Sequence, residues 1–270
     1  MSTDLHPTAS VEAEHRTGTR SSAPKRFVVV GTQRSGTTFI RQCLDSHPQV
    51  RCRGELFARS YGKADGYASY RHANVFHQLG HYLWRARQVR RFLGDRLTDV
   101  EVGVAVSGFK LMRSQVRRTP YWYPMVLDFM HEEHYHVLHV VRRNLLRVLV
   151  SRATARARGQ YHARDEVPTV QVALDVTTLL RSLDKLADEN AYWRTATRGL
   201  PVCVVEYEQF VDDRQVQSQR MLEFLGVDPE HPLHSPHQRV NRATLKETLS
   251  NFDDVAAVLA GTPFEAQLEG

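Results

Sequence analysis

A glycine-rich loop between an apolar strand and a helix-like segment carries the clearest chemistry in this sequence. The run Gly31-Thr-Gln-Arg-Ser-Gly-Thr-Thr38 directly follows Val-Val-Val. Backbone N–H groups and the helix dipole converge on such a loop, and its glycines let the chain approach an anion closely. The guanidinium of Arg34 and the hydroxyl groups of Ser35, Thr37 and Thr38 add donors that suit phosphate or sulfate oxygens. The predicted anion contacts are Gln33, Arg34, Ser35, Gly36, Thr37 and Thr38.

The loop differs from the phosphate loop of nucleoside triphosphatases at one decisive position. That motif, GxxxxGK[ST], needs a lysine where this chain has Thr37. The lysine normally reaches the β- and γ-phosphates beside Mg²⁺, whereas the cation here, Arg34, lies inside the loop. The sequence therefore argues against ATP chemistry and predicts a donor that is bound without a metal.

The overall charge favours an anionic partner. The chain has 36 Lys and Arg against 30 Asp and Glu, a net charge of +6, and a pI near 9.4. The basic residues are scattered, and no zinc-finger, RNA-recognition or basic-zipper signature accompanies them. A charged small molecule is therefore expected as the partner, rather than nucleic acid.

The cysteines and the apolar runs indicate the compartment. Three cysteines without a CxxC pair predict neither a disulfide framework nor a zinc site, which favours a reducing cytoplasm. The apolar runs are strand-sized, far below the roughly 20 residues of a membrane span. Residues 1–24 have no apolar core of a signal peptide and are expected to be disordered. A single domain is expected over residues 25–270.

Strand-like and helix-like segments alternate along this domain. This order, with nearly continuous apolar strands, predicts an α/β fold in which a parallel sheet is flanked by helices on both faces. Carboxyl ends of strands in such sheets are where ligands bind. The expected strands are 26–31, 102–111, 136–141 and 201–206, and the expected helices are 38–44, about 70–93, 123–131, 143–156 and 170–196.

Two motifs together resemble a known family. The sequence GTQRSGTT after VVV resembles the 5′-phosphosulfate loop of sulfotransferases that use 3′-phosphoadenosine 5′-phosphosulfate (PAPS), closest to the bacterial carbohydrate and protein-tyrosine branches. The strand at 136–141 leads to Arg143, with Ser151 eight positions later, which is similar to the family's 3′-phosphate motif. The resemblance implies that these two residues hold the 3′-phosphate. Arg142 remains the alternative in register.

Two later segments resemble the family's remaining cofactor contacts. Val205-Glu-Tyr207-Glu follows the last strand, as does the segment whose tyrosine packs near the adenine. The basic stretch from Arg239 to Lys246 resembles the C-terminal loop that closes over the donor, which implies a phosphate contact from Arg239. Packing in the core for Tyr207 and a solvated basic surface for Arg239 are the structural alternatives.

The acceptor side is implied by the spacing of one carboxylate. Glu55 lies 21 positions after Arg34, as does the catalytic base in the resembling branches, and His47 is the alternative base. Lys110, in a Gly-Phe-Lys strand similar to the family's, is implied to assist at the sulfate or else to form a structural ion pair. Arg34 would offset charge on the leaving phosphate oxygen.

The resemblance implies sulfuryl transfer to a hydroxyl of a small-molecule or carbohydrate acceptor. It leaves the acceptor unnamed and a homodimer possible. The aromatic residues between 57 and 100 fall where the family shapes its acceptor pocket. Two other functions stay open at this point: a P-loop kinase of a small molecule, and a non-catalytic module that binds nucleotides or RNA.

Overall fold

The computed structural model describes residues 23–58, 66–73, 82–117, 123–158, 170–235 and 243–269. The first 22 residues of the segment expected to be disordered lie outside these ranges. Within the described ranges, no helix is both long enough and apolar enough to cross a bilayer.

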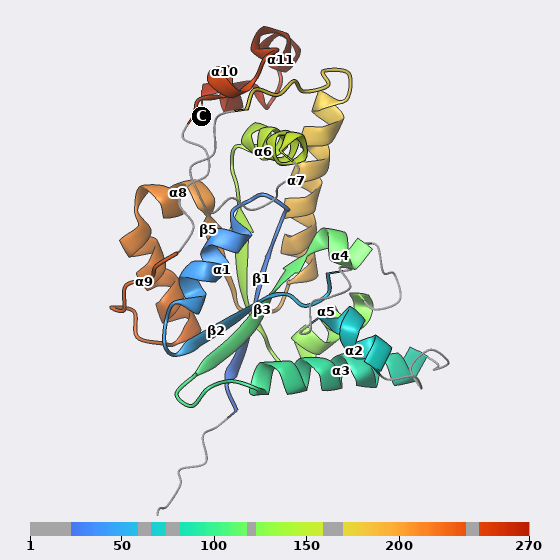
Figure 1. The fold of residues 1–270 in the computed structure, drawn as a ribbon, viewed down its shortest axis with the longest axis vertical. Coiled ribbons are helices and arrows are strands. Elements are labelled where there is room, and N and C mark those ends of the chain that lie inside the picture. Colours follow the sequence, from blue (N-terminus) through green and yellow to red (C-terminus); the bar gives the residue numbers. More distant parts are fainter. Residues whose placement is uncertain are drawn as a thin grey trace, which may run out of the picture.

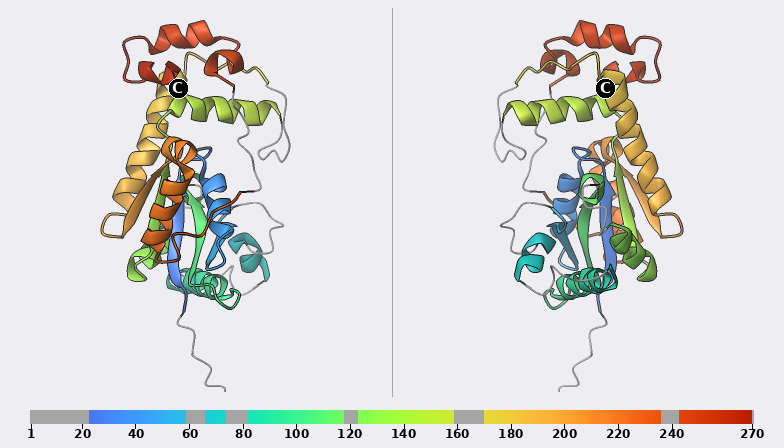
Figure 2. Two further views of the ribbon diagram at one scale, coloured as in Figure 1. Left: turned by 90° about the vertical axis from the view of Figure 1, so that its left-hand side faces the viewer. Right: turned by 90° about the vertical axis from the view of Figure 1, so that its right-hand side faces the viewer.

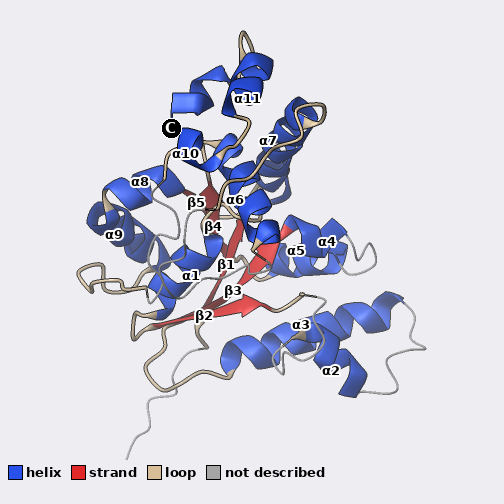
Figure 3. Cartoon of the chain, turned by 45° about the horizontal axis from the view of Figure 1, so that its top comes forward, coloured by secondary structure: helices blue, strands red, loops and turns tan. Residues whose placement is uncertain are grey.

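Five parallel strands form one sheet in the order β2-β3-β1-β4-β5, with helices on both faces (Figure 3). This confirms the predicted single α/β domain. The strands are β1 Lys25–Gly31, β2 Val50–Glu55, β3 Val106–Met112, β4 His136–Val141 and β5 Val202–Glu206. The helices are α1 Thr37–Asp45, α2 Tyr67–Ala73, α3 Tyr82–Thr98, α4 Arg113–Arg117, α5 Tyr123–Glu132, α6 Leu145–Ala157, α7 Leu179–Ala196, α8 Tyr207–Asp212, α9 Arg214–Leu225, α10 Leu245–Thr248, α11 Phe252–Leu259 and the 3₁₀ helix η2 Glu265–Glu269.

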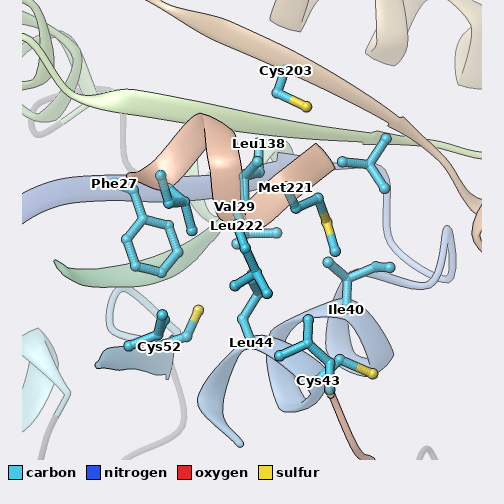
Figure 4. Packing of buried hydrophobic residues seen from close by; sticks show 14 of the residues in the cluster. Phe27, Val29, Ile40, Cys43, Leu44, Cys52, Leu138, Cys203, Met221 and Leu222 are labelled. Atoms are coloured by element: carbon cyan, nitrogen blue, oxygen red, sulfur yellow. The ribbon is translucent and has the colours of Figure 1, made fainter. Parts of the chain in front are cut away.

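Alternate residues of β1 enter two separate cores, because successive side chains of a strand point to opposite faces. Phe27 and Val29 pack with α1, α8 and α9, as Figure 4 shows for part of this core. Val28 and Val30 pack with α3, α5 and α7 on the other face. The sheet that carries the glycine-rich loop is therefore buried on both sides.

A third core lies beyond the end of the sheet toward which β1 runs (Figure 1). It joins α6 to α7 and to the C-terminal helices, and in both side views α6 lies between the sheet and those helices (Figure 2). Gln267 of η2 connects the C-terminal helices to the start of α6. Its side-chain oxygen accepts a hydrogen bond from the N–H of Leu146, and its backbone carbonyl accepts one from the side-chain amide of Asn144. The C-terminal layer therefore holds the start of α6.

Three expected boundaries differ from the structure. The single helix expected at about 70–93 is described as α2 and α3, with residues 74–81 outside the description. The strand expected from 102 begins at Val106, because Gly103 (φ 98°) lies in a turn that leaves Val102 fully exposed.

The helix expected over 170–196 begins only at Leu179. Val172 instead forms a parallel bridge with Leu249. The Asp175 carboxylate accepts from the N–H and hydroxyl of Thr177 and from the hydroxyl of Thr178. Such local side-chain bonds compete with helical ones, so the first turns are lost to a loop.

His139 of β4 predicts a pH-dependent stability. It is 1% exposed, and burial, followed by Arg194, lowers its pKa from 6.5 to about 4. The unfolded chain binds this proton below pH 6.5 while the folded chain does not, so folding stability should fall from pH 6.5 towards pH 4, by at most about 3 kcal/mol. Urea unfolding measured across this pH range should show a smaller loss of folding stability for His139→Gln than for the wild type. The exposed control His234→Gln should keep the wild-type slope, and equal slopes for all three proteins would contradict the assignment.

Candidate active site

Predicted site residues from all five strands lie together at the carboxyl ends of the strands, because parallel strands end at the same edge of a sheet. This carboxyl edge carries Glu55 at the end of β2, the glycine-rich loop after β1 and Lys110 in β3. Glu55 and Lys110 are directly paired in the β2–β3 register. Arg142 follows β4 and Tyr207 follows β5. Ligands of open α/β sheets bind at such an edge.

The glycine-rich loop ends in a helix start suited to an anion. Gly36 is the N-cap of α1 and provides no side-chain cap, and the first intrahelical bond is donated by Ile40 to the Gly36 carbonyl. The N–H groups before Ile40 have no partner within the helix. Gly36 has φ 96°, and a Cβ there would lie 2.1 Å from the Tyr207 ring. Only glycine fits this position.

The three loop hydroxyl groups predicted to contact the anion point in different directions. Ser35 is buried and donates to the Thr32 carbonyl at 2.8 Å, while Thr37 is buried and donates to the Met112 sulfur at 3.8 Å. Thr38 instead accepts from Lys110 at 2.9 Å. Of the three, only Thr38 is placed beside another predicted catalytic residue.

Arg34 connects the two phosphate motifs of the sequence. Its Nε donates to the Ser151 hydroxyl at 3.0 Å, so the structure brings together residues that lie 117 positions apart. Burial lowers the pKa of the Arg34 guanidinium, the Tyr207 phenol opposes this shift, and the positive charge of Arg152 adds to it. Two partly desolvated cations lie close together here, an arrangement that an anion would stabilise.

Arg143 is at the rim of the site. Its guanidinium is 62% exposed and forms an ion pair with Glu206, so Arg143 and Ser151 have different partners. The turn that carries Arg143 is fixed by Glu208, which accepts from the N–H groups of Arg143 and Asn144 at 3.1 and 3.3 Å.

Arg142 lies further inside. Its side chain is 15% exposed, its guanidinium lies 4.9 Å from the centre of the Tyr207 ring, and it donates to the Arg34 carbonyl at 3.4 Å. The predicted adenine-side residue Tyr207 thus contacts both Arg142 and Gly36.

Glu55 is held by two donors at the end of β2. Lys110 Nζ lies 2.7 Å from one carboxylate oxygen, and the side-chain amide of Gln115 donates to the other at 2.5 Å. Gln115 in turn accepts from the N–H of Met112 at the end of β3. The Glu55 side chain is 32% exposed and that of Lys110 only 8%. The carboxylate is therefore oriented but open to solvent.

The alternative base, His47, lies at the opposite edge of the sheet. It precedes Val50, where β2 begins, and it is 2% exposed. Its Nδ1 accepts from the N–H of Gln49, so its Nε2 carries the proton and donates to the Asp228 carbonyl at 3.0 Å. His47 is thus a buried structural residue far from the glycine-rich loop.

One aromatic residue expected to shape the acceptor pocket lies in the core instead. Tyr67 is buried and packs with Phe57 and Phe92 in the core. Arg239 lies outside the described residues, as do Tyr61, Phe76 and the side chains of Tyr82 and Trp84. Among the residues whose placement is described, no group of three His, Cys, Asp or Glu side chains could hold a metal ion.

Two contacts of the site were missed in the sequence. Gln115 lies 60 positions from the carboxylate it orients. Arg152 donates through Nε and Nη2 to the Gln33 carbonyl, 119 positions away, at 3.3 and 3.2 Å. Arg152 follows Ser151 directly, so its proximity to the phosphate motif is the one signal that points to it.

One comparison with known proteins shows the family of this chain. The sequence pattern of the sulfotransferase family matches residues 26–231. Among solved structures, the sulfotransferase from Alicyclobacillus acidocaldarius is 15% identical with a TM-score of 0.48, over 92% of this chain and 95% of that one. Mouse sulfotransferase SULT7A1, complexed with PAP, is 13% identical with a TM-score of 0.42, over 92% and 88% of the two chains. A search of curated proteins finds no match. Since the family pattern covers most of the chain and all five strands, the chain belongs to the sulfotransferase family.

Proposed function

We propose that this protein transfers a sulfuryl group from PAPS to a hydroxyl of a small-molecule or carbohydrate acceptor. One observation carries the proposal: a solvent-open carboxylate, Glu55, is joined through Lys110 to Thr38 of the glycine-rich loop. A base for the acceptor and a cation for the donor therefore lie side by side at the start of α1.

The donor fits the charges of the carboxyl edge. The start of α1 and Arg34 provide N–H donors for the 5′-phosphosulfate. Arg143 is exposed and forms an ion pair with Glu206 at the rim, from which its long side chain could turn towards a 3′-phosphate near Ser151. Tyr207, at the end of β5, offers an aromatic face for the adenine.

The proposed reaction follows from these positions. The acceptor hydroxyl donates its proton to Glu55 as its oxygen bonds to sulfur, while the bond from sulfur to the bridging phosphate oxygen breaks. Lys110 and Arg34 offset the negative charge that grows on that bridging oxygen. Each carboxylate oxygen can accept two hydrogen bonds, so the hydroxyl can reach Glu55 without displacing Lys110 or Gln115.

The kinase alternative is disfavoured by Thr37. It occupies the place of the catalytic lysine, and its hydroxyl is buried against Met112 rather than directed at a phosphate. Calorimetry separates the two functions: the protein should bind adenosine 3′,5′-bisphosphate in the presence of a chelator. Binding of ATP that needs Mg²⁺, without binding of the bisphosphate, would support a kinase.

The proposed setting is a reducing cytoplasm, because Cys43, Cys52 and Cys203 are all buried free thiols. Burial raises the pKa of the Cys43 thiol to about 11, which keeps it protonated and unreactive at neutral pH.

The Arg143 assignment predicts a ligand-specific loss. Arg143→Ala should weaken adenosine 3′,5′-bisphosphate at least tens-fold, because a charged hydrogen bond to phosphate contributes about 1.5–3 kcal/mol. Adenosine 5′-phosphate, which lacks the 3′ group, should be bound as by the wild type. Calorimetric titration of both ligands measures the difference. Equal losses for the two ligands would refute the assignment, and a 3′-specific loss in Arg142→Ala instead would transfer it to Arg142.

A further inference from the structure

The peptide bonds on both sides of Arg34 are held by other arginines. Arg34 has φ 73°, a left-handed conformation that residues other than glycine rarely adopt. The carbonyl before it, of Gln33, accepts both Nε and Nη2 of Arg152. The carbonyl after it, of Arg34 itself, accepts from Arg142.

Arg152 is itself anchored from behind. Glu189 of α7 lies 3.6 Å from its Nη2, and the two side chains are only 23% and 17% exposed. Burial lowers the pKa of Arg152, and the negative charge of Glu189 opposes this shift. Even a partly buried cation is costly to maintain unless a carboxylate and hydrogen bonds satisfy it. This arginine has both.

The direction of the Gln33 carbonyl matters for an anion. The peptide group is planar and trans, so a carbonyl that points to Arg152 turns the N–H of Arg34 the opposite way. A carbonyl oxygen turned into the loop would instead repel a bound phosphosulfate. The same contact supports the left-handed backbone from which the Arg34 side chain reaches Ser151.

We propose that Arg152, fixed by Glu189, is a positioning residue for the donor: it keeps the Gln33 carbonyl out of the anion site and holds Arg34 towards the 5′-phosphosulfate. The identity of the donor rests on the proposed function. The competing role is direct, with the Arg152 guanidinium itself binding a phosphate. A substitution of Glu189 separates the two roles, because it releases Arg152. If Arg152 positions the loop, its release should weaken binding of the 5′-phosphate. If Arg152 binds the phosphate directly, its release should not weaken that binding.

The test compares two nucleotides by calorimetry. Adenosine 3′,5′-bisphosphate and adenosine 3′-phosphate differ only in the 5′-phosphate, so the ratio of their affinities measures the contribution of the loop. We expect Arg152→Gln to reduce this ratio about tenfold or more, and Glu189→Gln to reduce it in the same direction, while the affinity for adenosine 3′-phosphate changes less than about twofold. Unchanged affinity for that ligand also shows that each variant is folded.

Arg156→Gln is the matched control. Arg156 lies one turn further along α6, is exposed, and loses the same charge. The ratio of the two nucleotide affinities in Arg156→Gln should stay within about twofold of the wild-type ratio, because surface charges are screened. An equal reduction in Arg156→Gln would assign the effect to net charge and overturn the proposal.

The remaining outcomes are also decisive. If the ratio of the two nucleotide affinities in Arg152→Gln equals that of the wild type, the positioning role is overturned. The same holds if this ratio rises or stays constant in Glu189→Gln. If the wild type itself binds both nucleotides equally, the proposed donor site fails rather than this inference. If the wild type prefers the bisphosphate and Arg152→Gln keeps that preference, the inference about Arg152 fails while the proposed donor site stands.

Discussion

Glu55→Gln should lower kcat by about 10²- to 10⁴-fold while the affinity for adenosine 3′,5′-bisphosphate stays within about twofold. Glutamine keeps the size of the side chain but cannot accept the acceptor's proton. The Glu55 carboxylate contacts Lys110 and Gln115 rather than the residues proposed to bind the nucleotide, so binding is spared. Single-turnover sulfuryl transfer measures the chemical step directly.

Glu133→Gln is the control for this loss of a carboxylate. Glu133 pairs with Arg26 near the start of β1, at the edge of the sheet opposite the site. Its removal should leave the rate of the chemical step unchanged. A near-normal single-turnover rate for Glu55→Gln would mean that another group accepts the proton.

Arg34→Gln should reduce kcat by about 10²- to 10³-fold, with a smaller loss of donor affinity. A preorganised donor at a developing negative charge contributes this much in other enzymes. Arg34 is partly buried and oriented by Ser151, so its charge is poorly screened by water. Single-turnover rates at saturating PAPS separate this effect from binding.

Two variants control for other causes. Arg156→Gln removes an exposed arginine and should keep the wild-type rate. Ser151→Ala removes the contact that orients Arg34 and should give a smaller loss of rate than Arg34→Gln. If Arg34→Gln changed only the donor affinity and not the rate at saturation, Arg34 would bind the ground state without assisting the transfer.

The sequence was sufficient for the parts of the site that local pattern determines. A glycine-rich loop between an apolar strand and a helix can form only at the carboxyl end of that strand, so the position of Arg34 was predictable. Glu55 was implied only by the family resemblance, and the structure pairs it with Lys110 at the same edge. Apolar strands separated by helices likewise predicted the parallel sheet.

The remaining contacts depend on which elements meet in space. Glu189 contacts Arg152 only because α7 packs on α6, and nothing in the local sequence of α7 marks Glu189. The partner of Arg143 was also unpredictable, since its charge fits a phosphate and a carboxylate equally well. The late start of α7 follows from the local hydrogen bonds of Asp175, and also from the pairing of Val172 with Leu249, which the sequence does not indicate.

Mass spectrometry of an acceptor library incubated with the protein and PAPS tests the central proposal most directly. With a chelator present, at least one hydroxyl compound should gain the mass of one SO₃ group, and adenosine 3′,5′-bisphosphate should be released in equal amount. The gain should disappear with Glu55→Gln. A phosphate-sized gain that requires ATP and Mg²⁺, with no transfer from PAPS to any acceptor, would contradict the account.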